Sequence, residues 1–74
     1  MLLVKAECKN VVTEKLAEIL SDYAEPGFRV WMYEKRIYAI FGLSSISSLK
    51  ILTEKFRELR IKFNFYRIEE VSEA

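Results

Sequence analysis

Residues 28–42 read FRVWMYEKRIYAIFG, and this stretch predicts two β-strands joined at the charged bend of residues 34–36. Branched and aromatic side chains favour strands because they pack well on a pleated surface. The bend contains neither Asn-Gly nor Asp-Gly, so we expect a loop somewhat longer than a tight primed turn. Helical patterns lie on both sides, which makes this hairpin the middle unit of the chain.

The two faces of the hairpin differ in chemistry, because side chains alternate between faces along a strand. One face is apolar and is expected to join the core: Phe28, Val30, Met32, Ile37, Ala39 and Phe41. The other face combines aromatic, basic and aliphatic side chains: Arg29, Trp31, Tyr33, Arg36, Tyr38 and Ile40. The second face is therefore the better candidate for contact with another molecule.

The first quarter of the chain predicts a strand and a helix. Residues 1–9 alternate between apolar and polar side chains, as in a half-buried strand. Asn10 is placed to cap the following helix, since its side-chain oxygen can accept from a free backbone N–H. Apolar residues recur at helical spacing from Val12 to Tyr23, and Pro26 disfavours helical geometry just before it. We expect this helix to end near Ala24.

The second half of the chain predicts another helix and another strand. Serines within residues 44–48 suit a helix start, and apolar residues follow at helical spacing from Ile46 to Leu59. Residues 61–71 alternate again, although the pattern becomes ambiguous near Ile68. Residues 69–74 are predicted to be an acidic, frayed tail.

The order strand, helix, strand, strand, helix, strand predicts a ferredoxin-like βαββαβ sandwich of the α+β class. Two helices are expected to cover one face of an antiparallel sheet and to leave the other face open. The 74 residues allow a single domain, residues 1–74.

Composition narrows the classes of function. The net charge is only +1, whereas a strongly basic nucleic-acid binder would carry a larger excess of Lys and Arg over Asp and Glu. Abundant Lys, Arg and Glu without His or Gln are typical of thermophile proteins. No stretch approaches the ~20 apolar residues of a membrane span, so we expect a cytoplasmic protein with no membrane partner.

Catalytic and metal-binding groups are scarce. The chain has no histidine and one cysteine, Cys8, which cannot form an internal disulfide or build a metal cage alone. Cys8 falls on an apolar face and is expected to be a small core residue. We therefore expect no enzymatic activity, no cofactor and no metal.

A protein partner is the leading functional expectation. Hydrophobic residues make up 51% of a chain that, at this size, buries only about 60% of its unfolded surface. Another chain, in a homodimer or a paralogue heterodimer, would cover the excess. The candidate contact residues share the open face: Arg29, Trp31, Tyr33, Tyr38, Ile40, Lys62 and Tyr66.

Two alternatives remain open from the same residues. The open face could bind RNA, with aromatics stacking on bases and basic groups meeting phosphates. Residues 36–40, RIYAI, resemble in three places the third-strand motif of the RNA recognition motif, but lack its glycine. The second alternative is a small regulatory ligand-binding domain that uses the loops at Gly27 and Gly42.

The layout is similar to one known family, the small dimerisation subunit of the KEOPS complex or its archaeal paralogue. In that family a hairpin leads into a helix with a Ser-x-x-Leu-Arg start. Here residues 37–41 lead into Ser44 and Ser45, and residues 48–50, Ser-Leu-Lys, stand where the Ser, Leu and Arg of that start would lie, with Lys50 in place of arginine. The resemblance implies a non-catalytic dimeric scaffold that helps seat tRNA during threonylcarbamoyl-adenosine modification.

Overall fold

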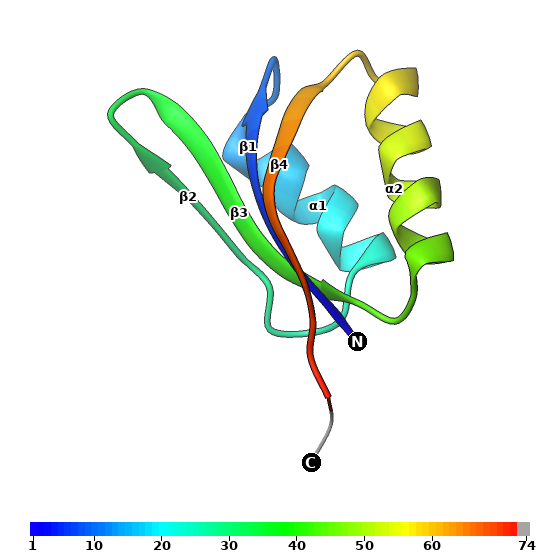
Figure 1. The fold of residues 1–74 in the computed structure, drawn as a ribbon. Coiled ribbons are helices and arrows are strands. Elements are labelled where there is room, and N and C mark those ends of the chain that lie inside the picture. Colours follow the sequence, from blue (N-terminus) through cyan, green and yellow to red (C-terminus); the bar gives the residue numbers. More distant parts are fainter. Residues whose placement is uncertain (73–74) are drawn as a thin grey trace.

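The structure is a computed structural model that describes residues 1–72. Its elements follow the predicted order: β1 (Leu2–Lys9), α1 (Thr13–Tyr23), β2 (Arg29–Tyr33), β3 (Arg36–Leu43), α2 (Ile46–Glu58) and β4 (Lys62–Glu70). The strands form one antiparallel sheet in the order β2-β3-β1-β4, and both helices lie on the same side of it (Figure 1). The prediction of a ferredoxin-like α+β sandwich is confirmed.

The core lies between the sheet and the two helices. Every second residue of β1 is buried, as its alternating pattern predicts. The largest buried side chains, Phe41 on β3 and Phe56 on α2, are 1% and 0% exposed. The core is completed by residues of the helices, of β3 and of the connection before β4: Leu16, Ile19, Leu20, Leu49, Leu52, Ala39, Leu43 and Ile61.

Three apolar residues of the predicted helix stripes lie outside the core. Val12 is the N-cap of α1, Ile46 is the first residue of α2, and Leu59 follows its last residue. Their side chains are 61%, 58% and 37% exposed, respectively. Helical spacing identifies which residues share a stripe, but it does not report how much of that stripe is covered.

The β2–β3 turn is tighter than the sequence predicts. Tyr33 pairs directly with Arg36, so Glu34 and Lys35 alone form the loop. Their φ angles are 50° and 66°, as in the two-residue type I′ turn, whose twist matches that of the flanking strands. The prediction of a longer loop is wrong because the pairing of the strands imposes a left-handed turn on residues that do not favour it.

Replacing Glu34-Lys35 by Asn-Gly is expected to stabilise the protein by about 1 kcal/mol, since left-handed backbone costs ordinary L-residues roughly that much. A shift of the urea midpoint at unchanged m-value would measure the gain. The chain supplies a matched control, because Glu54-Lys55 is the same dipeptide inside α2. The same exchange there should destabilise, as glycine disfavours a helix interior. A lower midpoint for the turn variant would contradict the type I′ assignment.

The two helix starts are built differently. Ser45 caps α2, and its Oγ accepts a hydrogen bond from the Ser48 N–H at 3.4 Å, as the serine cluster predicts. The prediction for Asn10 is wrong, because α1 begins after Val12 without a side-chain cap. Asn10 instead has a φ of 63° in the turn after β1, a conformation that asparagine tolerates better than most residues.

A β-bulge in β4 explains its ambiguous sequence pattern. Ala6 of β1 pairs with Phe65, but the adjacent Lys5 pairs with Arg67, which leaves Tyr66 as an extra residue. Before Tyr66, the even-numbered residues of β4 lie on the face opposite the helices. After Tyr66, the odd-numbered residues lie on that face, because the bulge adds one residue. This change of phase is what makes Ile68 appear to switch face.

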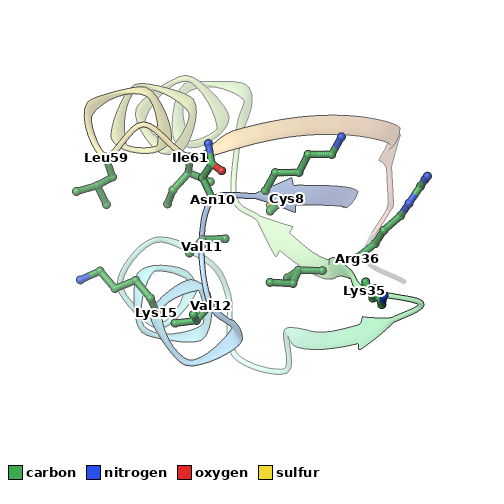
Figure 2. A pocket seen from close by; sticks show the side chains of 11 residues that line it. Cys8, Asn10, Val11, Val12, Lys15, Lys35, Arg36, Leu59 and Ile61 are labelled. Atoms are coloured by element: carbon green, nitrogen blue, oxygen red, sulfur yellow. The ribbon is translucent and has the colours of Figure 1, made fainter.

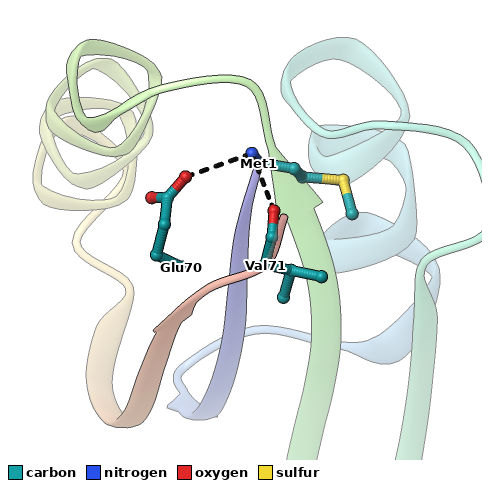
Figure 3. Close-up of polar contacts among 3 residues, drawn as sticks. All are labelled: Met1, Glu70 and Val71. Atoms are coloured by element: carbon teal, nitrogen blue, oxygen red, sulfur yellow. Dashed lines mark hydrogen bonds and ion pairs between the residues drawn. The ribbon is translucent and has the colours of Figure 1, made fainter. Parts of the chain in front are cut away.

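The tail predicted from residue 69 is ordered further than expected. Glu69 and Glu70 belong to β4, and the Val71 N–H donates to the Met1 carbonyl at 2.8 Å. The Met1 ammonium group also lies 3.4 Å from Glu70 Oε1 and 3.4 Å from the Val71 carbonyl oxygen (Figure 3). The prediction of fraying is wrong for these residues, because β1 provides a pairing partner for them; residues 73 and 74 lie outside the described residues.

Candidate interaction surface

The sheet surface opposite the helices is called here the open face. Strand alternation and the pairing register define its members. They are Leu3, Lys5, Glu7 and Lys9 of β1, Arg29, Trp31 and Tyr33 of β2, Arg36, Tyr38, Ile40 and Gly42 of β3, and Lys62, Asn64, Arg67 and Glu69 of β4.

Five of the seven predicted contact residues gather on the β2–β3 half of the open face. Trp31 pairs directly with Tyr38, and their rings stack with centroids 5.8 Å apart at an interplanar angle of 23°. Arg29 lies opposite Ile40 on the neighbouring strand, and Tyr33 lies one row beyond Trp31. The pairing thus places a continuous aromatic and aliphatic area between the guanidinium groups of Arg29 and Arg36.

The other two predicted contact residues lie on the far edge of the sheet. Lys62 begins β4 and pairs with Lys9, while Tyr66 is the extra residue of the bulge. β4 is separated from the hairpin by β1, which itself lies beside β3. The sequence pattern grouped these residues by face, but strand order divides them into two separate places.

The open face is more basic than the chain as a whole. It carries six basic and two acidic side chains, a net charge of +4 against +1 for the whole chain. Arg36 Nη1 lies 3.9 Å from Glu7 Oε2, and Arg67 pairs with Glu69. Within residues 1–72, no ion pair joins Lys5, Arg29 or Lys62 to a carboxylate, so these cations remain available to a partner.

The end of the hairpin is exposed on both faces of the sheet. Tyr33 on the open face and Met32 on the helix face are each 62% exposed, and Trp31 is 40% exposed. The prediction that Met32 belongs to the core is wrong, because the β2–β3 hairpin extends beyond the helices (Figure 1). The one sequence signal of this exposure is that Met32 lies only two residues before the charged turn.

Two of the grooves in the described part of the chain lie beside the sheet. One, of about 610 Å³, brings together Gly27 and Gly42, the glycines of the ligand-binding alternative, with Leu3 and Trp31. Gly42 permits the close approach of Met1, since an added Cβ would lie 2.8 Å from the Met1 sulfur. This groove has an apolar lining with Arg29 and Glu25 as its charged groups.

The other groove, of about 670 Å³, lies at the end of the sandwich where α1 begins (Figure 2). Its floor is apolar and includes Cys8, Val11 and Ile37. Its charged lining residues are all basic: Lys9, Lys15, Lys35 and Arg36. The labelled basic side chains point outward from the rim rather than toward one another in Figure 2, so they do not form a common anion site.

Cys8 is the one cysteine of the chain, and it is 2% exposed, which confirms its predicted place in the core. Burial raises the pKa of its thiol from 9.0 to about 11, and the Glu7 carboxylate adds to the rise. The thiol is therefore protonated, and poorly nucleophilic, at neutral pH. Among residues 1–72, no three Cys, Asp or Glu side chains cluster closely enough to hold a metal ion.

Comparison with known proteins adds no relative, since no family model, curated protein or solved structure matches the chain. Neither helix in the described part of the chain is long and apolar enough to cross a membrane. The open face and the exposed hairpin are therefore the features on which a functional proposal depends.

Proposed function

We propose that this chain is a non-catalytic assembly module that binds a second copy of itself through the β2–β3 hairpin. The exposure of Trp31, Met32 and Tyr33 at the end of the hairpin carries the proposal. Aromatic and methionine side chains are enriched at the centres of protein interfaces, where large, rigid groups lose little rotamer freedom on burial. The proposed contact would cover exposed apolar groups on both faces of one strand.

The chemistry of the hairpin suits a protein partner. Arg29 is the one charged residue of β2, so most of the strand can be desolvated without burying a charge. The Trp31–Tyr38 stack is already formed within one chain, which lowers the entropy cost of ordering these rings on binding. Pre-organised aromatic groups of this kind are typical of interface hot spots.

The resemblance to the KEOPS small subunit supports the same class of function. A member of that family would be a dimeric scaffold that helps seat tRNA, without catalytic groups of its own. We propose the same role for this chain, whose self-association would form such a scaffold. The spare cations of the open face, Lys5, Arg29 and Lys62, are compatible with a nearby nucleic acid.

RNA binding by the isolated open face is the second candidate, favoured by its net charge of +4 beside the Trp31–Tyr38 stack. Stacking of a base on an aromatic side chain contributes about 1–3 kcal/mol and is insensitive to sequence. Phosphate contacts from the cations would make such binding sensitive to salt.

One crosslinking experiment separates these candidates. The photoreactive residue p-benzoylphenylalanine replaces Tyr33 at the hairpin or, as the control, Glu54 on the exposed side of α2. Self-association through the hairpin predicts, on irradiation of the purified chain at micromolar concentration, a band of twice the 8.8 kDa chain mass for the Tyr33 variant alone. RNA binding predicts an RNase-sensitive product when total RNA is added at low salt.

The outcomes are distinct. A doubled band at position 33 and none at position 54 supports the assembly module. An RNA adduct without a doubled band replaces it by the second candidate. No product at position 33, or equal products at both positions, rejects hairpin-mediated assembly.

A further inference from the structure

The two edges of the sheet differ in how well they are protected from pairing with another strand. β4 contains the bulge at Tyr66, and four of its nine residues are charged. Both features discourage pairing between sheet edges. β2 has no bulge or proline, and one of its five residues is charged. Within the described chain, β2 is therefore the unprotected edge.

The turn determines which backbone groups of β2 are free. In a two-residue hairpin, the pair that closes the turn exchanges hydrogen bonds, and bonded and non-bonded pairs then alternate along the strands. Tyr33 and Arg36 close this turn, so Trp31 and Arg29 also direct their backbone groups toward β3. The N–H and C=O groups of Val30 and Met32 consequently point away from the sheet and are open to a partner.

The composition of β2 selects one pairing register. Antiparallel pairing about a two-fold axis at Trp31 matches all five residues of the strand: Val30 lies opposite Met32, and Arg29 lies opposite Tyr33. Centring the axis on Met32 would place the apolar Val30 opposite Glu34 and Arg29 opposite Lys35, a like-charge pair. Centring it on Val30 would place Tyr33 opposite Gly27, which has a φ of 97° and lies outside the strand.

We propose that two copies of this chain pair antiparallel through β2, with Trp31 on the two-fold axis, to form one continuous eight-stranded sheet. The proposal rests on self-association through the hairpin and adds its geometry. Val30 and Met32 exchange backbone hydrogen bonds, and their side chains cover each other on the helix face. On the open face, the two Trp31–Tyr38 stacks join into a single aromatic row, and Arg29 lies beside the partner's tyrosine as a cation–π pair.

Disulfide crosslinking tests the register directly. Residues 29 and 33 of opposite copies form a non-hydrogen-bonded pair, with Cα atoms about 4.5 Å apart, which is within the range for a disulfide. Arg29→Cys and Tyr33→Cys are prepared separately, then oxidised alone and mixed in equal amounts. The mixture is expected to give at least tenfold more disulfide-linked dimer than either variant alone. The buried Cys8 is expected to contribute no background.

A backbone substitution tests the pairing itself. Met32→Pro removes an N–H that points away from β3, so the fold should persist while the dimer is lost. Met32→Ala, the matched control, keeps the N–H and should still dimerise. Sedimentation at micromolar concentration is expected to show at least a tenfold higher dissociation constant for the proline variant than for the alanine variant. Circular dichroism checks that both remain folded.

Failure of this inference is distinguishable from failure of hairpin assembly. A doubled photocrosslinked band at position 33, with no excess disulfide in the mixed cysteine sample, overturns edge pairing and leaves the assembly module in place. Equal dissociation constants for folded Met32→Pro and Met32→Ala would likewise overturn edge pairing and leave the assembly module in place. A chain that is monomeric throughout, with no photocrosslink, overturns both.

Discussion

Replacing Phe41 by alanine is expected to lower the free energy of unfolding by about 3–5 kcal/mol. Phe41 is 1% exposed and packs from β3 into the layer between the sheet and the helices. Its removal leaves a cavity that the surrounding side chains can fill only in part. Because domains of this size are stabilised by about 5–15 kcal/mol in total, much of the margin would disappear.

Urea denaturation followed by circular dichroism would measure this loss. Ile40→Ala is the matched control, since Ile40 is the adjacent residue on the same strand and lies on the open face. Its half-buried side chain should cost about 1 kcal/mol or less by the transfer free energy of the removed carbons. Similar losses for the two variants would mean that the open face is as closely packed as the helix face, contrary to the structure.

Deleting Lys5 is expected to have the second largest effect, because β1 pairs with a strand on each side. With one residue fewer, the part of β1 before the deletion must either keep its pairing and invert its faces or lose pairing with β3 and β4. Inversion would turn Leu2 and Val4, which are 7% and 0% exposed, out of the core. Either route is expected to cost about 3 kcal/mol, since burial of one such side chain contributes about 1.5–3 kcal/mol.

Deleting Tyr66 is the matched control, because it also shortens one strand by one residue but removes the extra residue of the bulge. Phe65 would then directly precede Arg67, and the pairs Ala6–Phe65 and Lys5–Arg67 would keep their faces, so the expected cost is within about 1 kcal/mol. Hydrogen exchange should show lost protection of residues 2–4 in the Lys5 deletion alone. Equal loss of protection in both variants would contradict the assignment of Tyr66 as the extra residue.

The alternation of β1, the helical stripes and the order of elements were sufficient to predict the sandwich. These signals are local, since one strand or one helix reveals its own buried face. The stretch after Pro26 also predicted which hairpin residues share the open face. The Trp31–Tyr38 pair follows from that prediction once the short turn fixes the register.

The errors occurred where distant parts of the chain decide the outcome. Glu34 and Lys35 adopt left-handed backbone because the two strands they join are already paired. Met32 is exposed because the helical layer stops short of the hairpin tip, a matter of relative length that no local pattern reports. The extra residue at Tyr66 left a trace, the change of phase near Ile68, but its cause lies in the pairing with β1.

The pairing of Met1 with Val71 has a practical consequence for protein engineering. The two residues are hydrogen-bonded neighbours, so a short added linker could close the backbone into a ring without rearranging the sheet. Cutting that ring between Glu34 and Lys35 would yield a circular permutant in which the edge strand becomes the last segment of the chain. Such a permutant could be truncated or exchanged for a foreign strand while the remainder of the scaffold stays intact.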